Sequence, residues 1–380
     1  MTTNNTPVLS KSKTVYFVIG ILVLVLIAGL VTFLIPKDEE TIKIGFIGPL
    51  TGPIADPGEY IKNSFELANT LNNIVDGKNI EVIYEDGKGI PAEGVTAATK
   101  LLNVDRVDIV VNALSGGSLL AVAPLTEEKE KILISSVSAT PAVSEAGDYV
   151  FRISSSANLF AEKTALMIKE LNYNNIGIIA ENTEYAIGWK DSFIERFEGT
   201  LTKVETFNTG DVDVKTQLSK VDASNPDVIL MLVQSPISAV TLIKQAKEMG
   251  IDKQIIGNEG FFARGVVKNL MGDAAEGVLV LTYKYDLGSN EMQLFFKDYE
   301  SMYGEQIPEE MYGALGYDTY MLLYDALDHC NGADSKCLRD YLYTIENRSG
   351  VTGKFSLDAK GDGIRDFMWW KIKNKELIPF

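Results

Sequence analysis

Two short loops rich in glycine, serine and threonine carry groups that could bind a small charged molecule. The first, Ser115–Ser118, lies between an apolar run and a stretch with helical spacing. Its small residues would let a ligand approach the backbone, whose N–H groups and helix dipole favour an anion such as a carboxylate. The second, Ser138–Pro141, follows the next apolar run, and its hydroxyls and carbonyls could hold a carboxylate and an ammonium together. These loops predict a small-molecule site.

Each loop also has an interpretation that needs no ligand. Ser118 could cap the helix that begins beside it, and residues 138–141 could form the Ser/Thr turn that is common before proline. A third loop, residues 48–53, follows the first apolar run at a place where ligands of open α/β sheets bind, but it lacks the GxGxxG spacing of a dinucleotide turn. Residues 358–363 match a calcium loop only in part, because Lys360 replaces an acidic ligand, so we predict a turn there.

Composition and motifs exclude several classes of chemistry. The chain has one histidine, His329, which excludes two-His metal sites and Cys₂His₂ zinc fingers. It has neither a GxSxG nucleophile motif nor a phosphate-binding P-loop. A net charge of -17 opposes binding to nucleic acid, which requires clustered positive charge. We therefore predict a protein that is not an enzyme and that needs no metal and no cofactor.

Alternating strands and helices must position the polar loops. From Thr41 onward, short apolar runs alternate with amphipathic stretches, which predicts parallel sheets with helices on both faces. A first series of strands is expected at residues 42–46, 80–85, 107–112 and 132–136. A second series is expected at residues 175–180, 228–233, 255–256 and 278–281. The break near Ser156 predicts an α/β protein with two similar lobes.

The C-terminal part of the chain is predicted to be mainly helical. Helical spacing extends over residues 292–303, 312–330 and 338–345, and a glycine-rich stretch at 350–363 precedes a last strand at 367–372. Cys330 and Cys337 lie seven positions apart, and outside the cytoplasm such a pair is expected to form a disulfide. Two buried thiols are the alternative, and geometry decides between them.

An apolar segment precedes the predicted lobes. Residues 15–35 form an almost wholly apolar run, and a helix of about 20 residues spans a bilayer. Lysines precede the run, so the positive-inside rule places residues 1–14 in the cytoplasm and the bulk of the chain outside the cell membrane. A cleaved signal peptide is the alternative, although the run is long and no Ala-x-Ala site ends it. We therefore predict an uncleaved, single-pass signal-anchor.

The order of these loops and strands resembles a known family from about Thr41 to Phe380. The chain is similar to type I periplasmic solute-binding proteins, in particular the leucine/isoleucine/valine-binding group of ABC transporter receptors. The stretches that carry the resemblance are IKIGFIGPLTGPIADPGEYIKNSFELA, VDIVVNALSGGSLLAVAPLTEEKEKILISSVSATPAVSEAGDYVFR, NTEYAIGWKDSF, LIKQAKEMGIDKQIIGNEG, YDTYMLLYDAL and SGVTGKFSLDAKGDG.

The resemblance implies two doubly wound lobes with parallel sheets, joined by a hinge of three crossovers, with a ligand held between them. We expect the first lobe to comprise residues 41–156 and 286–350, and the second to comprise residues 157–285 and 351–380. The resemblance also implies permease subunits of an ABC transporter as the partner, and a monomeric outer domain.

The resemblance assigns ligand contacts by matched position. These are Ser115, Gly116, Ser138, Ala139, Thr140, Tyr185, Glu259 and Tyr317. Those of the first lobe would hold the ligand carboxylate by hydroxyl and N–H groups, and its ammonium in part by a carbonyl. Glu259 would receive the α-ammonium through a charged hydrogen bond. Tyr185 would be the aromatic cleft residue of the second lobe, and Tyr317 a further aromatic contact.

The chain departs from the family pattern at several of these positions. Gly116 stands where the family usually has a serine, and Pro57 and Ser235 stand where aromatic residues line the side-chain pocket. Tyr185 is followed by Ala186 rather than by glycine. We expect a receptor that binds a small amino acid, branched-chain or similarly hydrophobic, for uptake. The alternatives are the same fold binding an amide, urea or an aromatic acid, and a ligand-sensing domain.

Overall fold

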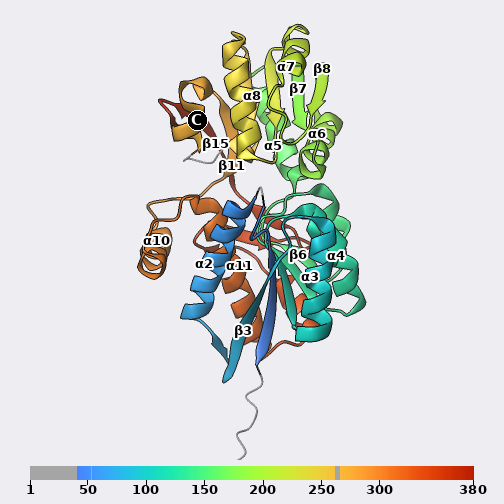
Figure 1. The fold of residues 1–380 in the computed structure, drawn as a ribbon, viewed down its shortest axis with the longest axis vertical. Coiled ribbons are helices and arrows are strands. Elements are labelled where there is room, and N and C mark those ends of the chain that lie inside the picture. Colours follow the sequence, from blue (N-terminus) through green and yellow to red (C-terminus); the bar gives the residue numbers. More distant parts are fainter. Residues whose placement is uncertain (1–40, 53, 262–265) are drawn as a thin grey trace, which may run out of the picture.

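The chain forms two α/β lobes that lie one above the other along the long axis of the molecule (Figure 1). This computed structural model describes residues 41–52, 54–261 and 266–380. Each lobe has a largely parallel sheet flanked by helices, so the predicted fold class is confirmed. The predicted membrane segment at residues 15–35 lies outside the described residues. Within the described ranges, no helix is long and apolar enough to cross a bilayer.

A six-stranded sheet in the order β2-β3-β1-β4-β5-β6 forms the centre of the first lobe. Its strands are β1 (Ile42–Gly48), β2 (Ile74–Val75), β3 (Lys78–Asp86), β4 (Ile109–Asn112), β5 (Ile132–Ser135) and β6 (Val150–Arg152). β1 is parallel to both of its neighbours, β3 and β4. β4 and β5 are buried at every position, as expected for strands of a parallel sheet covered by helices on both faces.

Helices from two distant parts of the chain cover this sheet. α2 (Ala55–Leu71), α3 (Pro91–Lys100), which continues into a π-helical turn over Leu101–Asp105, and α4 (Gly116–Glu128) follow its strands in sequence. α11 (Glu310–His329) returns from the C-terminal part and packs along α2. The ring of Phe65 on α2 lies 5.3 Å from that of Phe46 on β1 and 5.0 Å from that of Tyr320 on α11, between centroids. The core of the first lobe therefore requires α11.

The second lobe has a seven-stranded sheet in the order β16-β15-β11-β10-β9-β7-β8. Its strands are β7 (Asn175–Glu181), β8 (Thr200–Phe207), β9 (Val228–Leu232), β10 (Gln254–Gly257), β11 (Leu279–Tyr283), β15 (Phe367–Lys373) and β16 (Glu376–Pro379). The helices of this part are α5 (Ala157–Glu170), α6 (Glu184–Arg196), α7 (Lys215–Asp222) and α8 (Pro236–Glu248). β15 and β16 are antiparallel additions at the β11 edge.

The chain passes between the two lobes three times, which confirms the predicted three-crossover hinge. It crosses after β6, after β11, and again before β15, following α10 (Asn290–Tyr303), α11, α12 (Ser335–Leu342) and a small sheet of β12 (Arg348–Gly350), β13 (Gly353–Leu357) and β14 (Gly363–Arg365). The crossing segments lie side by side. The Ser155 N–H donates to the Tyr283 hydroxyl at 2.8 Å, and the Lys284 N–H donates to the Asp366 carbonyl at 2.8 Å.

Two buried charged side chains connect the crossing segments. The Arg365 guanidinium donates to the carbonyl of Ile153 at 2.8 Å and to the Thr352 hydroxyl at 2.6 Å. The Asp318 carboxylate on α11 accepts the N–H groups of Val351 and Thr352 at 2.8 and 3.0 Å. Each charge has several hydrogen-bond partners, and these bonds fix the geometry of the hinge strands, although burial lowers the pKa of Arg365.

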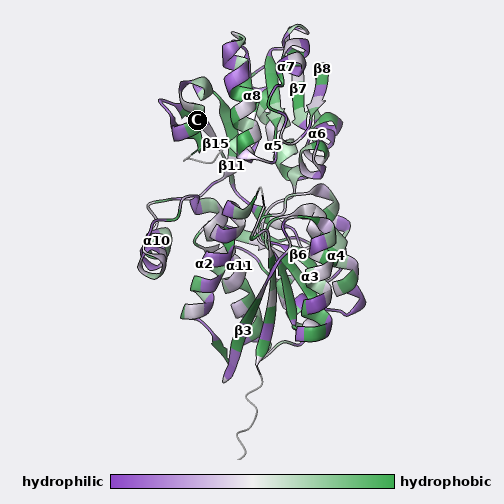
Figure 2. Cartoon of the chain, in the orientation of Figure 1, coloured by the Kyte–Doolittle hydropathy of each residue, from purple (hydrophilic) through white to green (hydrophobic). Residues whose placement is uncertain are grey.

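Hydropathy follows the layers of each lobe. Figure 2 shows apolar strands inside and polar residues on the outward faces of the helices, the pattern expected of amphipathic helices that cover a sheet. The sulfur atoms of Cys330 and Cys337 are bonded, with Cα atoms 5.9 Å apart, and connect the end of α11 to α12.

Candidate ligand-binding site

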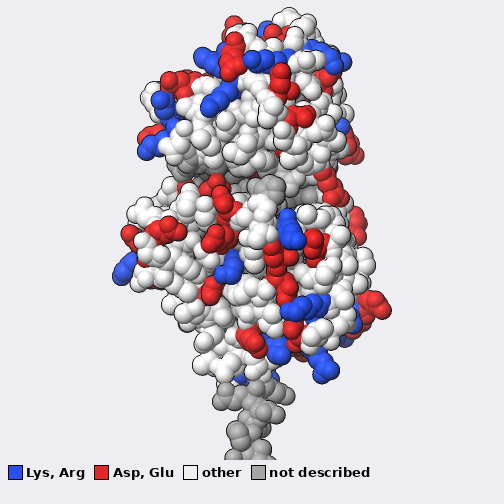
Figure 3. Space-filling view, in the orientation of Figure 1, with Lys and Arg blue, Asp and Glu red and all other residues white. Residues whose placement is uncertain are grey.

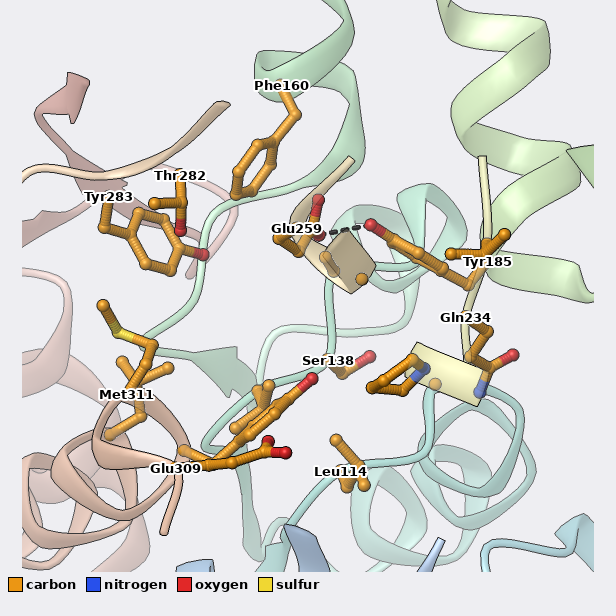
Figure 4. Close-up of a pocket in the computed structure, with 18 of the residues that line it drawn as sticks. Leu114, Ser138, Phe160, Tyr185, Gln234, Glu259, Thr282, Tyr283, Glu309 and Met311 are labelled. Carbon is orange, nitrogen blue, oxygen red and sulfur yellow. Dashed lines mark hydrogen bonds between the residues drawn. The ribbon is translucent and has the colours of Figure 1, made fainter. Parts of the chain in front are cut away.

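A cavity with about 1000 Å³ of empty space, partly open to solvent, lies between the two lobes (Figure 4). Both lobes contribute to its wall. The lining residues of the first lobe are Leu114, Gly116, Val137, Ser138, Ala139, Thr140, Glu309, Glu310, Met311, Tyr312 and Leu315. Those of the second lobe are Phe160, Tyr185, Val233, Gln234, Pro236, Glu259, Gly260, Thr282, Tyr283 and Tyr285.

Parallel pairing explains why residues so far apart in sequence meet here. Gly116 follows β4 and Ser138 follows β5, while Tyr185, Gln234 and Glu259 follow β7, β9 and β10. The carboxyl ends of parallel strands lie at one edge of a sheet, where ligands of open α/β sheets bind. These edges of the two sheets face each other across the cavity, so the loops that follow the strands form the wall of the cavity.

Gly116 allows the two polar loops of the first lobe to approach each other closely. A Cβ atom at this position would lie 2.0 Å from the Thr140 hydroxyl oxygen, 2.6 Å from the Thr140 Cβ and 2.9 Å from the Ser138 hydroxyl oxygen. Gly116 is the first residue of α4, whose first N–H groups have no partner within the helix. The N-terminus of α4 and the hydroxyls of Ser138 and Thr140 thus form one surface that can accept a carboxylate.

The buried Arg152 side chain holds the 138–140 loop in place. Its guanidinium donates to the carbonyls of Ser138 and Thr140 at 3.2 and 2.7 Å. It also makes a bidentate ion pair with Asp362, at 2.6 and 2.8 Å. Two carbonyl oxygens of the loop therefore point toward Arg152. Ser138 is buried, and within the described ranges its hydroxyl has no hydrogen-bond partner.

Tyr185 and Glu259 are joined in the second lobe. The Tyr185 hydroxyl donates to Glu259 Oε1 and accepts from Asn258 Nδ2 at 3.1 Å. Asn258 is itself fixed by the backbone of Val233, its Nδ2 donating to the Val233 carbonyl at 2.7 Å and its Oδ1 accepting the Val233 N–H at 3.0 Å. The tyrosine hydroxyl is thus oriented by Glu259, the first residue of η3 (Glu259–Phe261), and by Asn258, which is bonded to the residue that follows β9.

The buried Glu259 carboxyl can accept a hydrogen bond from a cationic group of a ligand. Burial raises its pKa to about 7, against the opposing hydrogen bond from Tyr185. Burial, followed by the Glu259 charge, raises the pKa of Tyr185, so this hydroxyl stays protonated and donates. Glu259 Oε2 is buried and has no hydrogen-bond partner among the residues that the structure describes. Since buried polar atoms are nearly always paired in native proteins, an unpaired carboxylate oxygen in a cavity points to a donor supplied by a ligand.

The structure brings most of the predicted site residues together, but not all. Gly116, Ser138, Ala139, Thr140, Tyr185 and Glu259 line the cavity. Ser115 does not, because its hydroxyl accepts the Ser118 N–H at 3.3 Å and donates to the Gly89 carbonyl at 3.0 Å. The helix cap is thus Ser115 and not Ser118. Tyr317 packs on Phe295 instead, with ring centroids 5.4 Å apart.

Several lining residues were not predicted from the sequence. Gln234 and Pro236 lie on either side of Ser235, whose hydroxyl caps α8 by accepting the Ile237 N–H. Others are Phe160, Tyr283, Glu309, Met311 and Tyr312. Tyr283 ends β11, so a longer strand prediction would have placed it at the sheet edge. No comparable local pattern predicts that Glu309 and Tyr312 line the cavity, because they lie at the start of α11, which packs in the first lobe although it lies far from the strands of that lobe in sequence.

The sequence profile of a family described as periplasmic binding protein matches residues 41–376. The chain belongs to this family. The predicted resemblance to type I periplasmic binding proteins is therefore confirmed, and the family is one of solute-binding proteins. A leucine-, isoleucine-, valine-, threonine- and alanine-binding protein of Pseudomonas aeruginosa is 25% identical over 350 residues, which cover 88% of this chain and 90% of that protein.

Solved structures of periplasmic binding proteins share the fold and contain different ligands. The branched-chain amino acid transporter substrate-binding protein of Streptococcus pneumoniae, in complex with isoleucine, is 26% identical with a TM-score of 0.78, covering 90% of this chain and 100% of that one. A solute-binding protein of an ABC transporter from Rhodopseudomonas palustris, in complex with 3,4-dihydroxybenzoic acid, is 25% identical with a TM-score of 0.79, covering 90% and 97%. The fold alone therefore does not determine the ligand.

Proposed function

We propose that this protein is the extracytoplasmic solute-binding component of an ABC transporter, and that it binds a small amino acid between its lobes. The observation that carries the proposal is a pair of complementary polar groups in one cavity that have no hydrogen-bond partner in the described part of the chain. The hydroxyl of Ser138 beside the N-terminus of α4 suits a carboxylate, and Oε2 of Glu259 suits an ammonium. An α-amino acid carries both charged groups on a single carbon atom.

Residues of both lobes contribute to the proposed head-group site. Ser138 and Thr140 of the first lobe would bind the carboxylate, and Tyr185 and Glu259 of the second would bind the ammonium. Ligand bound to both lobes would favour the closed arrangement, because only there are both sets of contacts made. We propose that residues 41–156 and 286–350 move against residues 157–285 and 351–380, and that the closed form delivers ligand to permease subunits. Residues 15–35 would anchor a monomeric receptor to the cell membrane.

A screen of ligands against the full-length chain tests this function. Thermal unfolding should be measured with each of the common amino acids, small amides, urea and benzoates. A ligand present at 100 times its dissociation constant stabilises the folded state by about 2.7 kcal/mol, so at least one amino acid should raise the melting temperature clearly. If no amino acid does so while an amide or a benzoate does, the amino-acid assignment is wrong and the solute-binding role stands.

An aromatic acid is the second candidate, since a structural relative was solved with 3,4-dihydroxybenzoic acid. The rings of Phe160, Tyr185 and Tyr283 line the cavity and could pack on an aromatic ligand. Such an acid has a carboxylate but no ammonium, and it would leave Glu259 Oε2 without a donor unless a ligand hydroxyl reached it. The Glu259 carboxyl therefore favours the amino acid.

A further inference from the structure

The described residues of the cavity wall carry more negative charge than an amino-acid head group can neutralise. Three of the described lining residues, Glu259, Glu309 and Glu310, have carboxyl groups. The described lining residues include no lysine, arginine or histidine. An amino acid with an uncharged side chain is neutral overall, and its single ammonium is already assigned to Glu259. Glu309, which directly precedes α11, therefore gains no positive charge from such a head group.

Glu309 is the carboxyl best placed to meet the rest of the ligand. It immediately precedes α11, is partly buried, and makes no capping hydrogen bond with the helix. Figure 4 shows Glu309 and Glu259 reaching the cavity from different lobes, with Ser138 between their elements and Met311 beside Glu309. Since Ser138 and Glu259 are assigned to the head group, the wall near Glu309, Met311 and Tyr312 is left for the ligand side chain.

The surroundings of Glu309 make an added cation favourable. Burial, followed by the charges of Glu310 and Asp56, raises the pKa of Glu309 to about 7. A partly buried carboxylate among like charges is unstable unless a cation compensates it. Figure 3 shows acidic side chains over α2 at the edge of the first lobe that faces the second. Their field would draw cations toward this edge and repel anions such as benzoates.

The aromatic residues of the cavity suit the same kind of group. The rings of Tyr185, Tyr283 and Tyr312 all line it. Tyr312 lies close enough to both Glu309 and Glu259 for their charges to raise its pKa, after burial as the main cause. Its hydroxyl therefore stays protonated, and the tyrosine ring faces offer a weak attraction for an ammonium or guanidinium.

We propose that Glu309 is a specificity-determining residue that binds a protonated nitrogen at the distal end of the ligand side chain, so that the ligand is a cationic amino acid. This inference rests on the proposed function, because it takes the head-group site as given. Met311 would pack on the methylene groups of such a side chain. The aliphatic side chain expected from the resemblance would instead leave Glu309 buried beside a ligand that cannot neutralise it.

Calorimetric titration of the full-length chain with matched ligands tests the inference. Lysine and norleucine have the same backbone and four-carbon chain length, but only lysine carries a distal ammonium. We expect lysine or the shorter ornithine to bind ~10-fold or more tightly than norleucine, the factor typical of a charge-assisted hydrogen bond. Norleucine or leucine binding as tightly as both cationic ligands would overturn the inference and leave the proposed function standing. Failure of every amino acid to bind would overturn both.

A nearly isosteric variant tests whether Glu309 causes the preference for a cationic ligand. Glu309→Gln should weaken lysine or ornithine binding ~10-fold and change norleucine binding less than about twofold. Glu128→Gln is the matched control, since it removes the same charge from an exposed position at the C-terminal end of α4, the end away from the cavity, and should leave both affinities unchanged. Equal loss for both ligands in Glu309→Gln would place Glu309 at the head group and contradict the assignment. The comparison of ligands on the unmodified protein does not depend on whether the variant folds.

Discussion

At the scale of single residues, the Glu259 carboxyl that we propose binds the ligand also lowers the stability of the ligand-free protein when it is charged. Its carboxyl has a folded-state pKa of about 7 against an ordinary value of 4.5. Between these values the folded state binds more protons than the unfolded state, so the contribution of this group to stability falls as pH rises from 4.5 through 7. The charge that would hold an ammonium is therefore destabilising until a cation arrives.

We predict that Glu259→Gln binds its amino acid at least ~10-fold more weakly at pH 8, because a charged hydrogen bond is replaced by a neutral one. The ligand-free variant should nevertheless melt ~2 °C or more above the unmodified protein at pH 8, and at the same temperature near pH 4, where the glutamate is protonated. Scanning calorimetry without ligand measures this difference. An equal difference at both pH values would show that ionisation of Glu259 is not its cause.

Gly116 is the residue at which the head-group site is most sensitive to volume. In Gly116→Ala, the new methyl would lie 2.0 Å from the Thr140 hydroxyl oxygen, so Thr140 and its loop must move. Overpacking of this kind costs about 1–3 kcal/mol, and we expect ligand affinity to fall by a similar free energy in a titration.

Gly288→Ala is the control for that substitution. Gly288 is exposed, and the nearest atom to an added Cβ is the Asp286 carboxylate oxygen at 3.3 Å. This variant should bind normally. Normal binding by Gly116→Ala as well would mean that Thr140 does not need its observed position.

At the scale of elements, α6 of the second lobe lies against the first lobe across the cavity. A Cβ at Gly188 on α6 would be 2.9 Å from Cδ of Pro141, the first residue of the 3₁₀ turn Pro141–Glu145. A Cβ at Gly117 on α4 would likewise be 2.9 Å from the Glu184 carboxylate, at the start of α6. Because Gly117 and Gly188 have no side chains, α4 and α6 can approach the opposite lobe closely on this side.

We predict that Gly188→Leu weakens ligand binding ~10-fold or more without lowering the melting temperature of the ligand-free protein. The leucine would hold α6 away from Pro141 and prevent full closure, while the core of each lobe is untouched. The measurements are calorimetric titration and thermal unfolding. Glu195→Leu is the control, because its side chain lies exposed on the same helix. If Gly188→Leu binds normally, contact between α6 and the first lobe is not needed for the bound state.

At the scale of the whole molecule, three crossing segments join two lobes that each have their own sheet. The contacts of Arg365 with Ile153 and Thr352 hold these segments together. The crossing segments lie side by side and are hydrogen-bonded to one another, an arrangement about which two lobes can rotate. Hinge closure around a ligand is the motion that this connection permits.

Small-angle scattering checks this motion. We predict that the full-length protein has a smaller radius of gyration with its amino-acid ligand than without it, because ligand contacts in both lobes favour the closed state. Gly188→Leu saturated with ligand should keep the larger radius. A radius that stays constant while calorimetry reports binding would mean that the ligand enters lobes that are already closed.

Much of the fold could be predicted from the sequence, because its signals are local. Apolar runs such as those of β4 and β5, followed by helical spacing, predict buried parallel strands and covering helices by periodicity alone. The break between the two strand series predicts two lobes for the same reason. Loops at the carboxyl ends of strands are candidate sites in any open α/β sheet, which is why Ser138 and Thr140 could be chosen from the strand pattern. Glu259 was predicted by matched position in the family resemblance.

Only the tertiary structure decided which side chains of those loops face the cavity. Ser115 and Ser138 are the same residue type in similar loops, yet Ser115 caps α4 and Ser138 is left without a partner in the cavity wall. Ser115 contacts Gly89, 26 positions away in sequence, and Ser138 contacts Arg152, 14 positions away. These contacts decide which of the two serines faces the cavity. Glu309 and Tyr312 reach the site because α11 packs on α2, and that contact joins residues some 250 positions apart. Periodicity describes a chain over one or two turns or strands, so it determines the elements and leaves their assembly, and with it the charge of the cavity, to long-range packing.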